Sequence, residues 1–166
     1  MLKNKYHSII IFIALFIFII VADRLSKNWI TEHILLNDGF PVIQGFFNIV
    51  NVRNFGGAFS IFQHQKLLFI SMGALVPIFL LIFLREKLSE LKYLITSTMI
   101  IGGAIGNLID RLLFGYVIDF LQFGTFPVFN IADSFITTGV ILLAYFMMKE
   151  DSEKKQETNL DQSTTK

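Results

Sequence analysis

The sequence of 166 residues contains no cysteine and few charges. Without cysteine the chain cannot form disulfides, hold a metal through thiolates, use a cysteine nucleophile or carry a thioether-linked lipid of its own. Only 16% of its residues are charged and 54% are hydrophobic, whereas soluble domains carry about 25% charged residues. A net charge of +1 gives no general electrostatic footprint for nucleic acid. Because a small soluble domain could not bury so much apolar surface, the composition predicts a single integral membrane domain.

Four apolar stretches are long enough to cross a bilayer. They comprise residues 6–22, 67–84, 91–109 and 131–148. The first stretch could also be a cleaved signal peptide, but no small-x-small site precedes Asp23-Arg24 and three further spans follow. We therefore predict an all-α membrane protein with four transmembrane helices in a domain of residues 1–149. Residues 150–166 are polar, and we predict that they form a disordered cytoplasmic tail.

The basic residues orient these spans, because cytoplasmic loops of membrane proteins carry an excess of Lys and Arg. With the N-terminus inside, nine basic residues lie on the inner side and five on the outer side. We therefore predict that both termini are cytoplasmic, which leaves residues 23–66 and 110–130 outside. Partial alternation of apolar and polar residues in the outer segments favours short strands resting on the membrane surface.

This topology also sorts the 13 acidic residues. Seven lie in the inner loop and tail and are typical of solvated charge. Asp23, Asp110 and Asp133 lie at the outer ends of spans one, three and four, so the topology places them at one depth. Asp119 is only nine residues beyond Asp110. A carboxylate at membrane depth costs roughly 2.5–3.5 kcal/mol on insertion scales, which makes such residues candidates for function.

Asp119 and Asp133 are the best candidates for acid–base chemistry. Two neighbouring carboxylates share one proton, so one can act as general base on a water and the other as general acid. Structural roles remain open for both, since Asp133 is suited to cap the fourth helix and Asp119 to a buried structural hydrogen bond. For Asp110, Arg111 and Asn107, a polar clamp at the helix end is the expected role.

Other chemistries find less support. The three histidines are scattered and match no metal-ligand spacing, and no nucleotide-binding or serine-hydrolase motif occurs. Ser134 follows Asp133 but has no His or Lys placed to activate it. Asn54 precedes Gly56-Gly57, which suits either a turn or the close approach of the backbone to a ligand.

Five short motifs contain most of the polar residues of the outer side. In chain order they are Asp23-Arg24-Leu25-Ser26-Lys27, Arg53-Asn54-Phe55-Gly56-Gly57-Ala58-Phe59, Gly106-Asn107-Leu108-Ile109-Asp110-Arg111, Val117-Ile118-Asp119-Phe120 and Phe129-Asn130-Ile131-Ala132-Asp133-Ser134. Together, and in this order, they closely resemble the lipoprotein signal peptidase family (signal peptidase II). The resemblance covers about residues 5 to 149, with one mild departure at Gly57, where the family more often has alanine.

The resemblance implies an aspartic endopeptidase of the bacterial cytoplasmic membrane. Such enzymes remove the signal peptide from diacylglyceryl-modified prolipoproteins, cutting N-terminal to the lipidated cysteine. Asp119 and Asp133 match the family's catalytic dyad. The family's supporting and substrate-binding positions are matched by Asp23, Asn54, Asn107, Asp110, Arg111 and Asn130. The family fold adds an extracytoplasmic β-cradle and a short surface helix to the four spans, and it places the active site near the outer leaflet.

The expected partners are prolipoprotein substrates and membrane lipids, with no nucleic acid, cofactor or metal, and the expected state is a monomer. The alternative function is a small proton-coupled membrane transporter, which predicts a carboxylate in the middle of a span. Here the acids cluster at the outer ends of the spans. A third interpretation is a scaffold whose aspartates only cap helices, and it predicts that Asp119→Asn and Asp133→Asn leave function intact.

Overall fold

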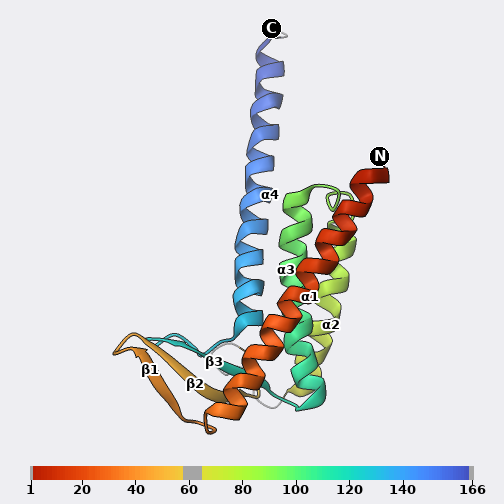
Figure 1. Ribbon diagram of the computed structural model, residues 1–166. Helices are drawn as coiled ribbons and strands as arrows, with labels where there is room; N and C mark the ends of the chain where they lie inside the picture. Colours follow the sequence, from red (N-terminus) through yellow and green to blue (C-terminus); the bar gives the residue numbers. More distant parts are fainter. Residues whose placement is uncertain (1, 58–64, 165–166) are drawn as a thin grey trace.

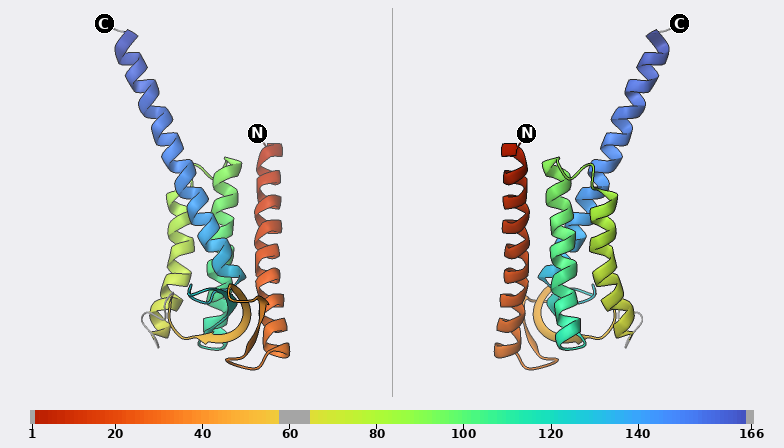
Figure 2. Two further views of the ribbon diagram at one scale, coloured as in Figure 1. Left: turned by 90° about the vertical axis from the view of Figure 1, so that its left-hand side faces the viewer. Right: turned by 90° about the vertical axis from the view of Figure 1, so that its right-hand side faces the viewer.

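The computed structural model describes residues 2–57 and 65–164 and consists of four long helices and one small sheet. In chain order the elements are α1 (Leu2–His33), β1 (Gly39–Ile43), β2 (Phe47–Asn54), α2 (Lys66–Phe83), α3 (Leu91–Leu113), β3 (Val117–Phe123) and α4 (Ile131–Thr164). The helices lie side by side with the sheet at one end of the bundle (Figure 1, Figure 2). Each helix holds an apolar stretch long enough to cross a membrane, so the predicted four spans and small sheet are confirmed.

Helix α3 is the centre of the bundle. In the apolar stretch of α3 that is long enough to cross the membrane, 67% is buried inside the protein, whereas 11% is buried in the corresponding stretch of each of the other three helices. Small residues allow this close packing. A Cβ added at Gly103 would overlap the backbone carbonyl oxygen of Ala132 in α4, and one added at Gly102 would lie 3.1 Å from the Ile19 side chain of α1. The outer faces of the helices, by contrast, expose large apolar side chains such as Phe79, as expected of a surface that faces lipid.

Helix α1 is longer than predicted. It continues past Asp23 to His33, so Asp23 lies inside a helix rather than at its end. The extension is held by a second apolar core, in which Ile30 of α1 and Ile34, the residue after the helix, pack against Ile118 and Phe120 of β3. This short apolar face was missed because it follows the charged residues that ended the predicted span. Its effect is to fix β3, which carries Asp119, to the first helix.

Helix α4 is also longer than predicted. The polar tail expected to be disordered from residue 150 is helical as far as Thr164. Ion pairs at i,i+4 spacing support the extension, with Lys154 at 2.8 Å from Glu150 and Lys155 at 2.7 Å from Asp151. Such pairs stabilise an isolated helix by about 0.2–0.5 kcal/mol each.

The three strands form an antiparallel sheet in the order β1-β2-β3. In β2 the register shifts between Ile49 and Val52, an irregularity that bends a strand. Strand β1 begins at Gly39 and tolerates Pro41 because it is an edge strand. The short surface helix implied by the family fold is not among the elements of the described residues.

Candidate active site

The predicted polar residues converge at the sheet end of the bundle. A cavity of about 710 Å³ is lined there by residues from β2, β3, α2, α3 and α4. Five of the predicted site residues line it, namely Asn54, Asn107, Arg111, Asp119 and Asp133. Asp119 and Asp133 are the acidic residues of its lining, as far as the described residues go. Asn130 donates a hydrogen bond to each carboxyl group, from its side chain to Asp119 and from its backbone N–H to Asp133, whereas Asp23 and Asp110 belong to a neighbouring polar cluster.

Asp119 is buried in β3, with 2% of its surface exposed. Its Oδ1 accepts a hydrogen bond from Asn130 Nδ2 at 2.7 Å, and its Oδ2 accepts one from Asn54 Nδ2 at 2.8 Å. Burial and, next, the nearby charge of Asp133 raise the pKa of Asp119 to about 7, although the two amide donors act in the opposite direction. Asp119 can therefore both hold and release a proton near neutral pH, as a catalytic acid requires.

Asp133 lies in the first turn of α4, where it forms a reciprocal capping box with Asn130. The backbone N–H of Asp133 donates to Asn130 Oδ1 at 2.9 Å, and the backbone N–H of Asn130 donates to Asp133 Oδ2 at 3.4 Å. Asp133 is therefore the third residue of the helix, and Asn130 rather than Asp133 is the N-cap. The other carboxylate oxygen of Asp133 accepts a hydrogen bond from Asn107 Nδ2 at 2.7 Å.

Asn130 joins the two carboxyl groups. Its side chain is fully buried and caps α4 through Oδ1, while its Nδ2 reaches Asp119 at 2.7 Å and Asn107 Oδ1 at 3.1 Å. One amide thus contacts β3, α3 and α4 together. The spacing of Asn130 and Asp133 in the sequence is what allows both the cap and the contact with Asp119.

Lys27 is the residue that sequence reasoning missed as a member of the site. Its side chain is completely buried, and its Nζ lies 2.7 Å from Asp23 Oδ2, 2.8 Å from Asp110 Oδ2 and 3.1 Å from Asn107 Oδ1. Arg24 reaches the other oxygen of Asp110 at 2.8 Å. Two cations and two carboxylates thus compensate one another, with Lys27, Asp23 and Asp110 buried and Arg24 partly exposed. The signal in the sequence is the i,i+4 spacing of Asp23 and Lys27, which is visible only if the helix continues past Asp23.

Asp23 and Asp110 also connect the helices to their neighbours. Asp23 Oδ1 accepts a hydrogen bond from the backbone N–H of Ala132 at 3.0 Å, which ties α1 to the start of α4. Asp110 Oδ2 accepts a weaker one from the backbone N–H of Ile118 at 3.5 Å, which ties α3 to β3. These contacts are those of the polar clamp expected for Asp110.

Arg111 and Asn54 hold the segment that follows β2 at the edge of the cavity. Arg111 donates to the carbonyl oxygen of Gly56 at 3.1 Å, and its guanidinium lies 4.8 Å from the centre of the Phe69 ring. Asn54 Oδ1 accepts from the backbone N–H of Gly56 at 2.9 Å, the local bond of an Asx turn. Both residues therefore shape this rim as well as facing the carboxylates. Ala58 and Phe59, which complete the motif, lie outside the described residues.

The rest of the cavity is mostly apolar, with Ser134, Thr137 and Thr138 of α4 as its other polar residues. Its wall is formed by side chains of the spans, among them Met72 and Val76 of α2, Ile100 of α3 and Ile136 of α4. The cavity therefore joins a polar end, with two carboxyl groups, to an apolar wall between helices. This fold and this cavity are those of a membrane-embedded protein, and two carboxyl groups that share one cavity are typical of the active site of an enzyme.

Comparison with known proteins identifies the family. A sequence model of the family described as signal peptidase (SPase) II matches residues 15–149. The lipoprotein signal peptidase of Caldanaerobacter subterraneus subsp. tengcongensis is 44% identical over 133 residues, which cover 79% of this chain and 91% of that protein. The lipoprotein signal peptidase of Streptococcus agalactiae serotype Ia is 42% identical over 139 residues, covering 82% and 90%. The chain therefore belongs to the signal peptidase II family.

Two solved structures agree with this assignment, and both are described as bacterial membrane enzymes. One superposes with a TM-score of 0.82 at 34% identity and covers 86% of this chain and 90% of its own length. The other has a TM-score of 0.76 at 34% identity, covering 83% and 92%. The chain is thus a multi-pass bacterial membrane protein and a protease, and the family gives no support to the transporter alternative.

Proposed function

We propose that the chain cleaves prolipoproteins as an aspartic endopeptidase in which Asp119 and Asp133 are the catalytic dyad. Membership of the signal peptidase II family supplies the function, which is removal of signal peptides from prolipoproteins. The observation that carries the catalytic proposal is a buried carboxyl with a pKa raised to about 7 that shares a cavity with a second carboxyl. Two carboxyl groups in one low-dielectric site provide an acid and a base at the same pH.

In this proposal Asp119 holds the shared proton and Asp133 is the base. Asp133 lies in the first turn of α4, where the helix dipole favours negative charge. It also accepts hydrogen bonds from Asn107 and from the backbone of Asn130, and such bonds stabilise a carboxylate. The raised pKa of Asp119 supports its role as the protonated partner.

The reaction then needs one water and no covalent intermediate. Asp133 takes a proton from the water while the oxygen of that water attacks the scissile carbonyl carbon. Asp119 gives its proton to the carbonyl oxygen. The product is a neutral gem-diol. When it collapses, the C–N bond breaks, Asp133 returns its proton to the leaving amine, and a hydroxyl of the diol returns a proton to Asp119. Both carboxyl groups end in their starting states.

The shape of the cavity suits a substrate that comes from the membrane. The signal peptide is apolar, and the apolar wall between α2, α3 and α4 gives it a place beside the dyad. We propose that the substrate enters sideways from the bilayer and is cut N-terminal to its diacylglyceryl-modified cysteine. The enzyme acts as a monomer in this proposal, because the residues that hold the dyad come from a single chain.

The arrangement of the chain supports the proposed orientation in the membrane. Both termini lie at the end of the bundle opposite the sheet (Figure 1). If the termini are cytoplasmic, as the distribution of Lys and Arg indicates, the dyad lies at the outer leaflet. Prolipoproteins present their cleavage site on that side after translocation of their mature part.

A cleavage assay tests the proposal. Purified protein in detergent is incubated with a diacylglyceryl-modified prolipoprotein, and the product is sized by gel shift and by mass spectrometry. We expect a cut N-terminal to the lipidated cysteine that is lost in Asp119→Asn and in Asp133→Asn and is unaffected by chelators. Glu32→Gln is the matched control, because Glu32 is an exposed acid of the same outer region. Normal cleavage by either dyad variant, shown to be folded by its thermal melt, would contradict the proposal.

A further inference from the structure

Five phenylalanines form a continuous cluster at the end of the sheet that lies away from the bundle. This aromatic tip consists of Phe46, Phe47, Phe123, Phe126 and Phe129. Phe123 is its centre, stacked on Phe47 with ring centroids 4.4 Å apart, and 5.8 Å from both Phe46 and Phe129. Phe126 meets Phe129 edge-on at 5.8 Å. The outermost members, Phe46 and Phe126, are 56% and 59% exposed, so the cluster presents a large aromatic surface.

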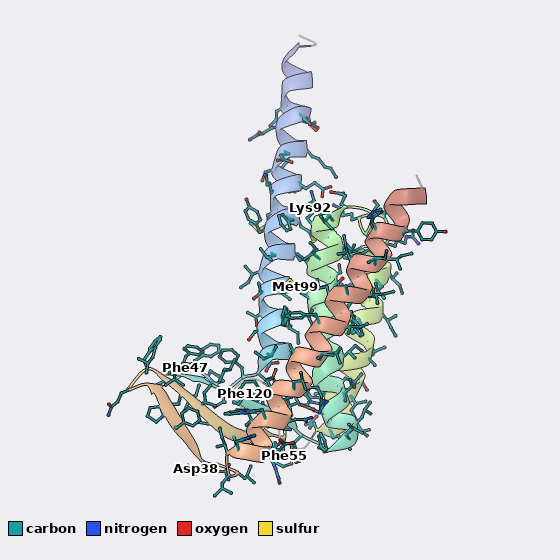
Figure 3. The ribbon with its side chains drawn as sticks, viewed as in Figure 1. Asp38, Phe47, Phe55, Lys92, Met99 and Phe120 are labelled. Atoms are coloured by element: carbon teal, nitrogen blue, oxygen red, sulfur yellow. The ribbon has the colours of Figure 1, made fainter. Side chains whose placement is uncertain are left out.

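The surroundings of the aromatic tip suit lipid rather than water. Residues 42–49 and 121–129, which contain it, include no Asp, Glu, Lys or Arg. The sheet projects sideways from the helix ends (Figure 1), and Phe47 lies at its far end (Figure 3). Because the spanning helices fix the position of the bilayer, a sheet attached to their outer ends lies over the neighbouring leaflet. Exposed aromatic residues are typical of that interface.

The aromatic tip is also continuous with the candidate active site. Phe126 and Phe129 line the same cavity as Asp119 and Asp133. Strand β3 contains both Asp119 and Phe123, and four residues of strand span about 13 Å. Leu121 and Phe123 follow Asp119 at two-residue spacing, which places them on the same face of β3, so apolar side chains lead from Asp119 towards the tip.

We propose that the aromatic tip binds an acyl chain of the diacylglyceryl group on the substrate's cysteine. The inference rests on the proposed function, because a cut beside the lipidated cysteine brings its glycerol group to the dyad. An acyl chain that starts there and follows β3 reaches the rings of the tip, while the signal peptide fills the cavity between the helices. The enzyme thereby recognises the lipid as well as the peptide.

The dependence of cleavage on acyl-chain length tests the proposal. The kcat/KM values are measured in mixed micelles for one prolipopeptide carrying dipalmitoyl or dihexanoyl glycerol. The variant is Phe46→Ala with Phe126→Ala, both exposed, and the control is Phe79→Ala, which removes an exposed ring of α2 outside the cavity lining. Partition of the substrates into micelles affects all three proteins alike, so it cancels in the comparison.

We expect the ratio of long-chain to short-chain kcat/KM to fall about three- to tenfold in the tip variant and to stay at the wild-type value in Phe79→Ala. The effect is modest because lipid tails are as apolar as the rings, so only the packing against them is lost. An unchanged ratio in the tip variant would overturn the inference and leave the proposed function standing. Absence of cleavage by the wild type would overturn the proposed function itself.

A second measurement does not depend on the tip variant folding. The full-length Asp133→Asn protein is irradiated with a substrate that carries a diazirine at the end of one acyl chain, and the adducts are mapped by mass spectrometry. Adducts at Phe46, Phe47 or residues 123–129 support the inference. Adducts confined to the lipid-facing sides of the helices, or a tip covered by a second copy of the chain, would overturn it.

Discussion

At the scale of single residues, the direction of the Asn107 amide depends on Lys27. Asn107 Nδ2 donates to Asp133, while Asn107 Oδ1 accepts from Lys27 Nζ at 3.1 Å and from Asn130 Nδ2 at 3.1 Å. If the amide turned over, two donors would face its nitrogen and the Asp133 carboxylate would face its oxygen. The buried ammonium group therefore holds the proposed base through one intervening side chain.

Lys27→Met should destabilise the protein strongly. The substitution keeps the length of the side chain but leaves the buried carboxylates of Asp23 and Asp110 without the cation between them, a loss of about 3–5 kcal/mol when a buried pair is broken. The measurement is the midpoint of thermal unfolding in detergent. Lys155→Met is the control, because the Lys155 side chain is 73% exposed and its ion pair with Asp151 lies at the surface. Equal shifts in the two variants would contradict this role of Lys27.

The pH profile of cleavage should have an alkaline limb set by Asp119. With a pKa of about 7, Asp119 is protonated below neutral pH and loses the acidic proton above it, so kcat/KM should fall about tenfold per pH unit above that limit. Asn54 donates to the carboxyl and lowers the pKa of Asp119. Asn54→Ala should therefore raise this pKa and move the limb to higher pH. A limb at the same pH in both proteins would refute the assignment of the proton to Asp119.

At the scale of elements, the contact of α3 with α4 determines the geometry of the site. Asn107 and Arg111 project from α3, whereas Asp133 lies in the first turn of α4, and at Gly103 the two helices approach too closely for a Cβ. Gly103 faces the backbone carbonyl of Ala132 in α4, which is one residue before Asp133. The position of Asp133 relative to Asn107 thus depends on the absence of a side chain at Gly103.

Gly103→Ala should reduce both stability and cleavage. The new Cβ meets a backbone carbonyl, which cannot rotate away, so the helices must separate at a cost of about 1–3 kcal/mol. Gly102→Ala is the matched helical control, because Gly102 does not line the cavity and its Cβ would meet the outer atoms of the Ile19 side chain at 3.1 Å, which can shift. Unfolding midpoints and kcat of the two variants provide the comparison. A Gly103→Ala protein as stable and active as Gly102→Ala would show that the close approach has no such role.

The elements also show what could be predicted from the sequence. The four spans follow from apolar length, and the pairing of Asp119 with Asp133 follows from the predicted topology, which places both on one side of the membrane. Lys27 cannot be found in this way, since its i,i+4 partner Asp23 follows the apolar stretch directly and so indicates the end of a span. The helical tail was missed for a related reason: polar composition indicates disorder, whereas the spacing of Glu150 and Lys154 favours a helix.

Other features of the site depend on contacts between segments distant in the chain. The meeting of Asn54 with Asp119 requires the pairing of β2 with β3, and no local pattern specifies that register. The capping box of Asn130 and Asp133 is readable afterwards as an Asn-x-x-Asp spacing. From the sequence alone, Asp133 itself is the more evident cap.

At the scale of the whole molecule, the chain places its chemistry at one end and its termini at the other (Figure 1). The sheet, the proposed dyad and the aromatic tip share one end of the bundle, and the charged extension of α4 projects from the opposite end. The two termini lie at the same end because the number of spans in the described residues is even.

Cysteine labelling can test this orientation without background, because the natural chain has no cysteine. Asp38→Cys, in the exposed turn before β1, should react with a membrane-impermeant maleimide in intact cells. Lys155→Cys, on the extension of α4, should react only after the membrane is permeabilised. Labelling of both sites in intact cells, or of Lys155→Cys alone, would contradict the proposed topology.

The measurement that tests the central claim most directly is a double-variant cycle on the dyad. Single-turnover cleavage is followed in Asp119→Asn, Asp133→Asn and the combined variant, each confirmed as folded. If the two carboxyl groups act as one unit, each single substitution lowers the rate by at least about 100-fold, and the combined variant is no slower than the slower single variant. Multiplication of the two losses in the combined variant, or substantial cleavage by either single variant, would contradict a catalytic dyad.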